Sequence, residues 1–407
     1  MKLIISEEEP SVERGYEFVE RKGRGHPDTL ADGLAEYLSA KYSQYTLKNF
    51  GAILHHNFDK VGLLGGSSSV EFGRGRLVKP IRVLLNGRAS TSFGKKKIPV
   101  EKLLVKWSGE FLKNELPSVS PQRNISFIYA LSTQSSPGKT KQNSTASARP
   151  FWFEPRGFQD IPELTKLVSN DTSLGVGYAP YSVLENLLLS IEKHFNSDLF
   201  RSRNKWIGSD IKILGFRYKK QFDITLCIPQ IANFVNSSKQ YYANLGKAKK
   251  IIFAIGKTLG IEKINLYINT RDNDEKSEYY LTAIGSSIES GDEGFVGRGN
   301  RVNGIISPFR PMSMEGVAGK NPVYHIGKLY YVLAHQLAHL IYKKFGIQTS
   351  VAIASQSGRD LLDPWIATIS VPRSFTSKDQ LEKLIRTKVK QLAKITQNII
   401  KGCVSIC

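Results

Sequence analysis

Hydrophobic and polar positions recur along this chain with two different periods, one typical of helices and one typical of strands. Leu30, Leu34, Leu38 and Tyr42 lie four residues apart, so they form one apolar stripe on a helix that begins near Thr29. Helical patterns recur at about residues 98–115, 181–195, 237–259, 321–345 and 377–401. Strand patterns lie at about residues 49–65, 79–87, 211–217, 222–229, 263–270 and 349–356. Because strands and helices alternate in pieces, the pattern predicts a mixed α/β fold.

Three stretches lack both periods and are expected to be loops. Ser132 to Pro150 is rich in Ser, Thr, Gln and Lys and has no apolar face, which predicts a mobile loop. Loops of this length in compact enzymes are commonly lids or simply disordered. A glycine-dense loop is expected at residues 285–304. A shorter loop between the first two strands is marked by Gly65, Gly66, Gly73 and Gly75.

Length and composition indicate a folded protein of two or three structural units. The chain has 407 residues, 41% of them hydrophobic, and no apolar run approaches the roughly 20 residues that a membrane-spanning helix needs. Three approximate blocks of strands and helices follow one another, at residues 1–130, 131–260 and 261–407. The N-terminal stretch turns acidic at once, unlike a signal peptide, and the three cysteines suggest neither a metal cluster nor a disulfide framework. These features predict a cytoplasmic protein.

The net charge is strongly positive. The 57 Lys and Arg residues outnumber the 36 Asp and Glu residues, which gives +21 at pH 7. A field of this sign implies a polyanionic partner: nucleic acid, an anionic membrane surface or a phosphate-rich substrate. Charge alone does not choose among these, and short runs such as GKKKI and KAKK are usually solvated faces.

Cations, glycines and a histidine precede the first helix, in the sequence RKGRGHPD that ends at Asp28. Asp28 is a good N-cap residue, but an N-cap needs no neighbouring cations. Backbone N–H groups and the helix dipole favour an anion at this end of a helix. Asp28 could ligate Mg²⁺, which prefers few carboxylates together with substrate phosphates. The alternative interpretation of His26 is a turn histidine without further function.

Two other clusters leave two interpretations open. His55 and His56 are adjacent on a predicted strand and point to opposite faces, so they are either a buried, hydrogen-bonded pair or part of a polar site. Asp210 and Lys212 lie two residues apart on another predicted strand and share a face. For these two residues, taken alone, an exposed cross-strand ion pair is the simpler explanation.

The stretch from Ser290 to Pro322 combines many glycines with cations. Glycines let the backbone approach a ligand, and Arg298 and Arg301 offer planar forks to phosphate oxygens. Lys320 stands just ahead of a predicted helix, whose start can also face phosphate. The sequence contains neither a Walker motif nor a strand-bound dinucleotide fingerprint, so another architecture is expected to bind the phosphates.

These blocks resemble the S-adenosylmethionine synthetase (methionine adenosyltransferase) family, in its archaeal-type branch. The resemblance spans most of residues 12–372 and rests on VERKGRGHPDTLADGLAE, ILHHNFDKVGLLGG, NDTSLGVGYAP, SDIKILG and GDEGFVGRGNRVNGIISPFRPMSMEGVAGKNP in this order. It implies three similar, interleaved subdomains in a pseudo-threefold arrangement. It also implies a homodimer with shared active sites, or a pair of such dimers. The implied reaction joins methionine to ATP at the ribose C5′ and cleaves the released triphosphate to phosphate and diphosphate, with Mg²⁺ and K⁺ as cofactors.

The same resemblance implies roles for individual residues. The implied catalytic residues, which act at the breaking C5′–O bond and on the polyphosphate, are His26, Lys212, Arg298 and Lys320. The residues implied to bind ATP and its phosphates are His26, Asp210, Lys212, Arg298, Arg301, Lys320 and His325. Those implied to bind methionine are His55, His56, Asn57, Asp171 and Asp292. Asp28 is the implied Mg²⁺ ligand.

Three positions depart from the family pattern. Tyr324 stands where archaeal relatives usually carry Asn, Phe58 replaces a usual Thr, and Ser67 stands where bacterial relatives carry a Glu that helps to seat methionine. With the longer, more basic segment 132–150, they motivate an alternative: a relative that uses another thioether or a methionine analogue. A nucleic-acid-binding protein would explain the net charge. It would not explain the carboxylates among the cations of the motifs, because acids repel a phosphate backbone.

Overall fold

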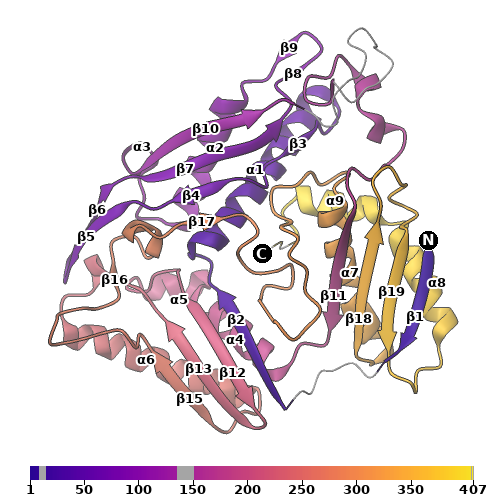
Figure 1. Cartoon of the computed structure of the whole chain (residues 1–407). Coiled ribbons are helices and arrows are strands. Elements are labelled where there is room, and N and C mark those ends of the chain that lie inside the picture. Colours follow the sequence, from indigo (N-terminus) through magenta and orange to yellow (C-terminus); the bar gives the residue numbers. More distant parts are fainter. Residues whose placement is uncertain (9–14, 135–150, 405, 407) are drawn as a thin grey trace.

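Three β-sheets surround a common centre in the computed structural model, which describes residues 1–8, 15–134, 151–404 and 406 (Figure 1). The first sheet has the order β1 (Lys2–Glu7), β19 (Ile366–Val371), β18 (Thr349–Ser355) and β11 (Ser173–Ala179). The second has the order β15 (Ile264–Ile268), β13 (Gln221–Cys227), β12 (Lys212–Tyr218) and β2 (Tyr16–Lys22). The third has the order β10 (Ile125–Ser132), β7 (Ile81–Ala89), β4 (Gly62–Leu64) and β17 (Gly294–Phe295), and β3 (His56–Asn57) also pairs with β7. The predicted mixed α/β class is confirmed.

The chain passes from sheet to sheet instead of completing one sheet at a time. β1 pairs in parallel with β19, from Lys2 opposite Ile366 to Glu7 opposite Val371. The next strand, β2, pairs antiparallel with β12 in the second sheet. β17 comes late in the chain but joins the third sheet beside β4. The subdomains are therefore interleaved, and the linear block boundaries at 130 and 260 stay a prediction.

Helices cover one face of each sheet and bury its apolar side chains. The third sheet contacts α1 (Pro27–Phe50) and α2 (Val100–Glu115), and the second sheet contacts α4 (Val183–Phe195) and α6 (Ser238–Thr258). The first sheet contacts α7 (Ile326–Phe345), which packs on α8 (Lys378–Val389) and α9 (Leu392–Ile400). Two short helices remain: α3 (Pro121–Asn124) contacts α2, and α5 (Asp198–Arg203) contacts α4. The predicted apolar stripe of α1 is confirmed, since Leu30, Leu34, Leu38 and Tyr42 are at most 1% exposed.

The opposite faces of the sheets keep apolar side chains at the surface. Along β12, Ile213 is fully buried, whereas its neighbour Leu214 is 45% exposed. Phe18 of β2 and Tyr267 of β15 lie in the same sheet and are 40% and 50% exposed. The first sheet likewise exposes Ile4 and Leu174. A single chain therefore presents apolar sheet surfaces that none of its described helices covers.

The glycine-rich stretch between β4 and β7 differs from the predicted loop. It forms a hairpin of β5 (Ser67–Glu71) and β6 (Arg74–Lys79) that turns at Gly73, where φ is +80°. The predicted strand 49–65 is reduced to β3 and β4, because α1 continues to Phe50 and ends at a left-handed Gly51. The remaining small pairs are β8 (Ser92–Phe93) with β9 (Lys96–Lys97) and β14 (Gln230–Ile231) with β16 (Leu281–Thr282).

The last two predicted helices also differ in their limits. The helix expected at 321–345 begins at Ile326, because the preceding residues form a bridge in which Lys320 pairs with Asn57. The helix expected at 377–401 is divided into α8 and α9. The candidate lid, Ser132 to Pro150, lies outside the described residues from position 135 onward. Among the described helices, none combines the length and apolar character that crossing a membrane requires.

Candidate active site

His26 stands at the N-cap of α1, where β2 leads into the helix. Its ring Nδ1 accepts a hydrogen bond from the backbone N–H of Asp28 at 3.1 Å. Gly23 and Gly25 allow this turn to pack against the segment before β12, since a Cβ on Gly25 would lie 2.2 Å from Ser209 Oγ. The glycines of the motif are therefore needed for close packing, and the backbone fixes the position of the His26 ring.

The His26 ring is neutral at physiological pH and has one tautomer. Because Nδ1 accepts a hydrogen bond, the proton of the neutral ring is on Nε2. Burial lowers the pKa of His26 to about 4, and the Lys22 cation contributes to this decrease. The side chain therefore offers a single N–H donor, at Nε2, to a ligand beside the helix start.

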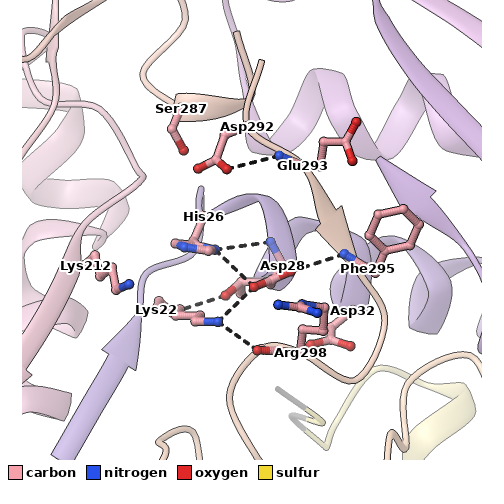
Figure 2. Close-up of polar contacts among 12 residues, drawn as sticks. Lys22, His26, Asp28, Asp32, Lys212, Ser287, Asp292, Glu293, Phe295 and Arg298 are labelled. Atoms are coloured by element: carbon pink, nitrogen blue, oxygen red, sulfur yellow. Dashed lines mark hydrogen bonds and ion pairs between the residues drawn. The ribbon is translucent and has the colours of Figure 1, made fainter. Parts of the chain in front are cut away.

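The Asp28 carboxylate lies in the same turn and already holds a cation. Lys22 Nζ donates to Asp28 Oδ2 and to the Arg298 carbonyl, both at 2.8 Å (Figure 2). The other oxygen, Oδ1, accepts from the Phe295 N–H at 3.2 Å. Only 6% of Asp28 is exposed. This carboxylate therefore ties the start of α1 to the glycine-rich loop that carries Arg298.

Further predicted residues converge on His26 from other elements. Lys212, the first residue of β12, and Asp292, from the loop before β17, lie beside the His26 ring (Figure 2). After burial and Lys22, the nearby charge of Lys212 also lowers the pKa of His26, whereas Asp28 and Asp292 raise it. We call Lys22, His26, Asp28, Lys212, Asp292 and Arg298 the His26 cluster. It unites residues that the sequence places in three separate motifs.

Asp210 lies behind this cluster as a buried carboxylate. It is 2% exposed, and its Oδ2 accepts from the backbone N–H and the hydroxyl of Ser287 at 2.9 and 2.5 Å. Burial raises the pKa of Asp210 to about 6. The predicted exposed cross-strand ion pair is confirmed for Lys212, which pairs with Glu20 of β2 at 3.4 Å, whereas the buried Asp210 takes no part in it.

A second, polar stripe of α1 holds the glycine-rich loop. Asp28, Asp32 and Glu36 are four residues apart, so they lie on one side of the helix. Asp32 Oδ1 accepts from the Gly297 N–H at 2.8 Å, and Glu36 Oε2 accepts from the Gly319 N–H at 3.0 Å. The sequence offered only a weak signal for this stripe, because carboxylates at this spacing also describe a solvated helix face.

Asp32 is expected to make stability depend on pH near neutrality. Burial raises its pKa from 3.8 to about 7. Between these values the folded protein keeps a proton that the unfolded chain has released, so the contribution of Asp32 to stability decreases as pH rises. Asp32→Asn stays neutral and should lack this decrease. The free energy of unfolding in urea is measured at pH 5 and pH 8. From pH 5 to pH 8 the value for the variant should rise by roughly 1–3 kcal/mol relative to that for the parent. An identical pH dependence in both proteins would contradict the assignment.

A second group of charged residues surrounds Lys320, at the far end of the glycine-rich loop. Lys320 is 7% exposed and pairs with Glu315, and burial lowers its pKa to about 8. Lys328 is fully buried and donates to the two Glu36 oxygens at 2.9 and 2.6 Å and to the Lys320 carbonyl at 2.6 Å. His325, the N-cap residue of α7, is 4% exposed, and burial holds its pKa well below the usual value. We call these five residues the Lys320 cluster.

The residues predicted to bind methionine fall in different places. Asp292 belongs to the His26 cluster. Asp171 lies near Lys320: with Asp59, it raises the Lys320 pKa against the larger effect of burial. Asn57 also lies beside Lys320, through the backbone bridge between the two residues. One chain therefore does not gather the predicted methionine set around a single point.

His55 and His56 form a buried, hydrogen-bonded pair, one of the two interpretations that the sequence left open. His55 Nδ1 bonds to the Trp152 carbonyl at 2.9 Å, and its Nε2 bonds to Glu163 Oε2 at 3.0 Å. Both ring nitrogens of His56 are engaged as well, by a serine of α1 at 2.8 Å and a backbone carbonyl at 2.9 Å. This arrangement leaves no ring nitrogen for methionine, so their contribution is to the interior.

Arg301, which was predicted to bind phosphate, instead contacts the backbone of its own loop. Its Nη2 donates to the carbonyls of Gly297 and Gly299 at 2.6 and 2.7 Å, and the side chain is largely buried. A guanidinium that is occupied by backbone carbonyls holds the loop in shape instead of facing a phosphate. Arg298, in contrast, is exposed beside Asp28 (Figure 2).

Two positions that depart from the family pattern pack around the histidine pair. The ring of Phe58 is fully buried with its centroid 5.4 Å from that of His56. Tyr324 is 7% exposed, and its ring centroid is 5.1 Å from that of His55. Both residues are part of the core, so neither favours an altered substrate.

Known proteins resemble this chain over nearly its whole length. A model of the S-adenosylmethionine synthetase (AdoMet synthetase) family matches residues 2–147 and 155–403. The S-adenosylmethionine synthase of Thermoplasma volcanium is 34% identical across 100% of both chains. That of Pyrococcus furiosus is 39% identical over 90% of this chain and 88% of its own. The structure of an S-adenosylmethionine synthetase from Campylobacter jejuni gives a TM-score of 0.52 at 13% identity, over 95% of this chain and 88% of its own, and so supports the fold alone.

Proposed function

Because this chain belongs to the S-adenosylmethionine synthetase family, we propose that it makes S-adenosylmethionine from ATP and L-methionine and cleaves the released triphosphate to phosphate and diphosphate. The observation that carries the proposal is the neutral His26 ring, which presents an Nε2–H donor beside Lys212 at the start of a helix. A fixed donor of this kind suits an oxygen that becomes more negative as a bond breaks.

The reaction forms a bond from the methionine sulfur to the ribose C5′ of ATP and breaks the bond from C5′ to the triphosphate oxygen. The electron pair of the broken bond stays on the triphosphate. A thioether is a weak nucleophile, so positioning and stabilisation of the leaving group have to supply most of the rate. In our proposal His26 donates to the leaving oxygen, while Lys212, Arg298 and Lys320 bind the phosphates through charge-assisted hydrogen bonds.

We propose that a homodimer completes each site. The His26 and Lys320 clusters are anchored at Asp28 and Glu36, eight residues apart and so about 12 Å along α1. Among the described residues, no hydrogen bond or ion pair joins the side chains of one cluster to those of the other. The exposed apolar sheet faces around Phe18 and Leu214 offer a surface for a second copy. The His26 cluster of one subunit would then face the Lys320 cluster of its partner.

Mixing two inactive variants tests this arrangement. His26→Asn and Lys320→Ala should each be nearly inactive alone, because each damages one half of every site. If the halves come from different subunits, mixed dimers contain one site with both halves intact. We expect unfolding and refolding of an equal mixture to restore up to about one quarter of the parent activity, since half of the dimers are mixed and half of their sites are intact. No recovery, in a mixture shown to contain mixed dimers, would place each site within one chain.

We propose Asp28 as a ligand of Mg²⁺. Among the described residues, no group of three or more His, Cys, Asp or Glu is placed to hold a metal. A single carboxylate fits an ion that takes its remaining ligands from phosphates and water. In this structure the Asp28 Oδ2 atom accepts a hydrogen bond from the Lys22 ammonium. When bound, Mg²⁺ would supply neutralisation of the triphosphate charge. We propose K⁺ as a second cofactor and assign no residues to it.

Asp28→Asn is expected to raise the Mg²⁺ concentration that gives half-maximal activity by at least about tenfold, because an amide is a weaker ligand than a carboxylate. Initial rates at saturating ATP and methionine over a Mg²⁺ series measure this change. The Lys22→Gln variant is the matched control, since it removes the neighbouring ammonium and keeps the carboxylate. An unchanged Mg²⁺ requirement in Asp28→Asn would mean that Asp28 acts only through Lys22.

The proposed reaction itself has a direct test. The protein is incubated with ATP, Mg²⁺, K⁺ and methionine, and S-adenosylmethionine, phosphate and diphosphate are quantified. We expect all three products, and less of them when K⁺ is omitted. Absence of S-adenosylmethionine across a range of K⁺ concentrations would overturn the proposal.

We also propose a cytoplasmic location. The described cysteines, Cys227 and Cys403, are free thiols. Free thiols persist in reducing compartments. Fractionation of the source cells, with an antibody to this chain, would contradict the assignment if the protein were found outside the cytoplasmic fraction.

A further inference from the structure

One helix of the second sheet carries positive charge that adenosyl transfer does not use. α6 contains five lysines and no acidic residue. The five, all exposed, are Lys239, Lys247, Lys249, Lys250 and Lys257. None of them forms an ion pair with a described residue. Part of the +21 net charge is therefore concentrated on one helix face.

The lysines of α6 form a straight track. At 3.6 residues per turn, Lys239, Lys250 and Lys257 fall within about 20° of one line along the helix, and the other two lysines flank that line. The track runs for about 27 Å from the first lysine to the last. Exposed Ala243 and Gly246 lie between Lys239 and Lys250, so this part of the track carries only small side chains along the line. An extended row of charges suits a polymer better than a compact anion.

Two aromatic side chains border the track. Tyr242 is 41% exposed and Phe253 is 38% exposed. Lys249 Nζ lies 5.8 Å from the centroid of the Phe253 ring. Cations that follow a phosphate backbone, beside aromatic rings on which bases stack, are the combination that single-stranded nucleic acids require.

Two other helices of this protein with a solvated face mix charges of both signs. On α2, Lys106 pairs with Glu110 at 3.9 Å, and on α8 Arg386 pairs with Glu382 at 2.7 Å. Like charges three or four residues apart weaken a helix, and α6 has no carboxylate to offset them. The composition of α6 is therefore unfavourable for the helix itself and indicates an anionic partner.

A membrane surface is a poorer fit for this helix than nucleic acid. Helices that bind bilayers insert an apolar face among the lipids. The apolar side of α6, with Tyr241, Ala248 and Ile252, is fully buried in the protein. The exposed aromatics alone leave too little apolar surface for insertion.

The positive track continues beyond the C-terminal end of α6. A cavity of about 720 Å³ there is lined by Lys219, Lys220 and Lys263, with one carboxylate, Glu262, among them. Lys219 and Lys220 form the turn between β12 and β13, and Lys219 has φ +53°. Asn or Gly is favoured in such a turn, and here both positions instead carry exposed lysines.

From these observations we propose that α6 and the adjoining Lys219–Lys220 turn bind single-stranded nucleic acid, separately from adenosyl transfer. α6 itself contains no carboxylate, and Asp274, to which the Tyr242 hydroxyl donates at 3.0 Å, lies at its border. The helix lies on the covered side of the second sheet, away from the exposed apolar face proposed for the second copy, so it remains accessible in the dimer (Figure 1).

The test uses fluorescence anisotropy with the full-length protein. The probes are fluorescein-labelled 20-nucleotide oligouridine and oligothymidine, at several KCl concentrations. At low salt, we expect the triple variant Lys239→Gln, Lys250→Gln and Lys257→Gln to bind the probes at least about tenfold more weakly than the parent protein. The slope of log affinity against log salt is negative and should become shallower by about 2, because each of the three lost phosphate contacts on a single strand contributes about 0.7. Phe253→Ala should lower affinity about fivefold or more and leave the slope unchanged.

A second triple variant controls for net charge. Lys383→Gln, Lys390→Gln and Lys394→Gln remove the same charge from the exposed surface of the C-terminal helices. We expect this control to bind within about twofold of the parent, because its lysines contact no phosphate in the proposed complex. Equal losses in both triple variants, no binding by the parent, or α6-dependent binding only to phosphatidylserine vesicles would overturn the proposal. Adenosyl transfer is assayed in the same samples, so either proposal can fail without the other.

Discussion

Replacing His26 by asparagine is expected to lower the rate of S-adenosylmethionine formation by about 10²-fold or more, the range for losing a donor to a developing oxyanion. Asparagine is a good N-cap residue, so the start of α1 should be retained while the Nε2–H donor is lost. Initial rates at saturating ATP and methionine measure the effect. Because the pKa of His26 is lowered to about 4, the parent should lose no activity through His26 between pH 5.5 and pH 8.

Triphosphate as a substrate separates two roles for His26. Hydrolysis of triphosphate breaks a phosphorus–oxygen bond and does not involve the ribose C5′ atom. A donor to the C5′ oxygen should therefore matter less for triphosphate hydrolysis than for adenosyl transfer. Equal losses in the two assays would show that His26 only positions the phosphates.

Lys328→Met is expected to lower the free energy of unfolding by about 3–5 kcal/mol, as for other buried ion pairs that lose one partner. The Lys328 ammonium is fully buried and donates to Glu36 and to the Lys320 carbonyl. Methionine fills a similar volume but donates no hydrogen bond, so the Glu36 carboxylate loses its cation and the carbonyl loses its donor. Urea unfolding followed by fluorescence measures the change.

Two further variants show whether the loss of stability in Lys328→Met comes from the buried ion pair. Lys106→Met removes a lysine from the exposed pair with Glu110 on α2 and should cost less than about 1 kcal/mol. Adding Glu36→Gln to Lys328→Met should recover part of the loss, because the remaining partner is then uncharged. A loss below about 1 kcal/mol in Lys328→Met itself would contradict the buried pair.

The apolar period predicted much of the fold, because each element it marks has one buried face. The stripe on α1 and the strands that became β7, β12, β13 and β18 were all correctly located. Strand β1 was not predicted, since its partner strand begins only at Ile366 and nothing local marks the pairing. The hairpin of β5 and β6 was interpreted as a loop because Gly65, Gly66, Gly73 and Gly75 interrupt the stretch in which it lies.

The site was predicted less completely, because burial is not visible in sequence. Asp32, Glu36 and Lys328 look like solvated helix residues until the glycine-rich loop is seen to cover them. Two interpretations were left open for the His55–His56 pair, and only its distant partners decide between them. The lysines of α6 present the converse case, since their exposure is what makes them informative.

The pairing of β1 with β19 also affects how the chain is made. β1 is synthesised before its partner, which follows roughly 360 residues later and takes roughly 20–70 s to be made at about 5–20 residues per second. Throughout that time β1 is a strand without its native partner, and unpaired edges invite pairing with other chains. A chain whose synthesis stops before Ile366 therefore cannot complete its first sheet, however well its other parts have folded.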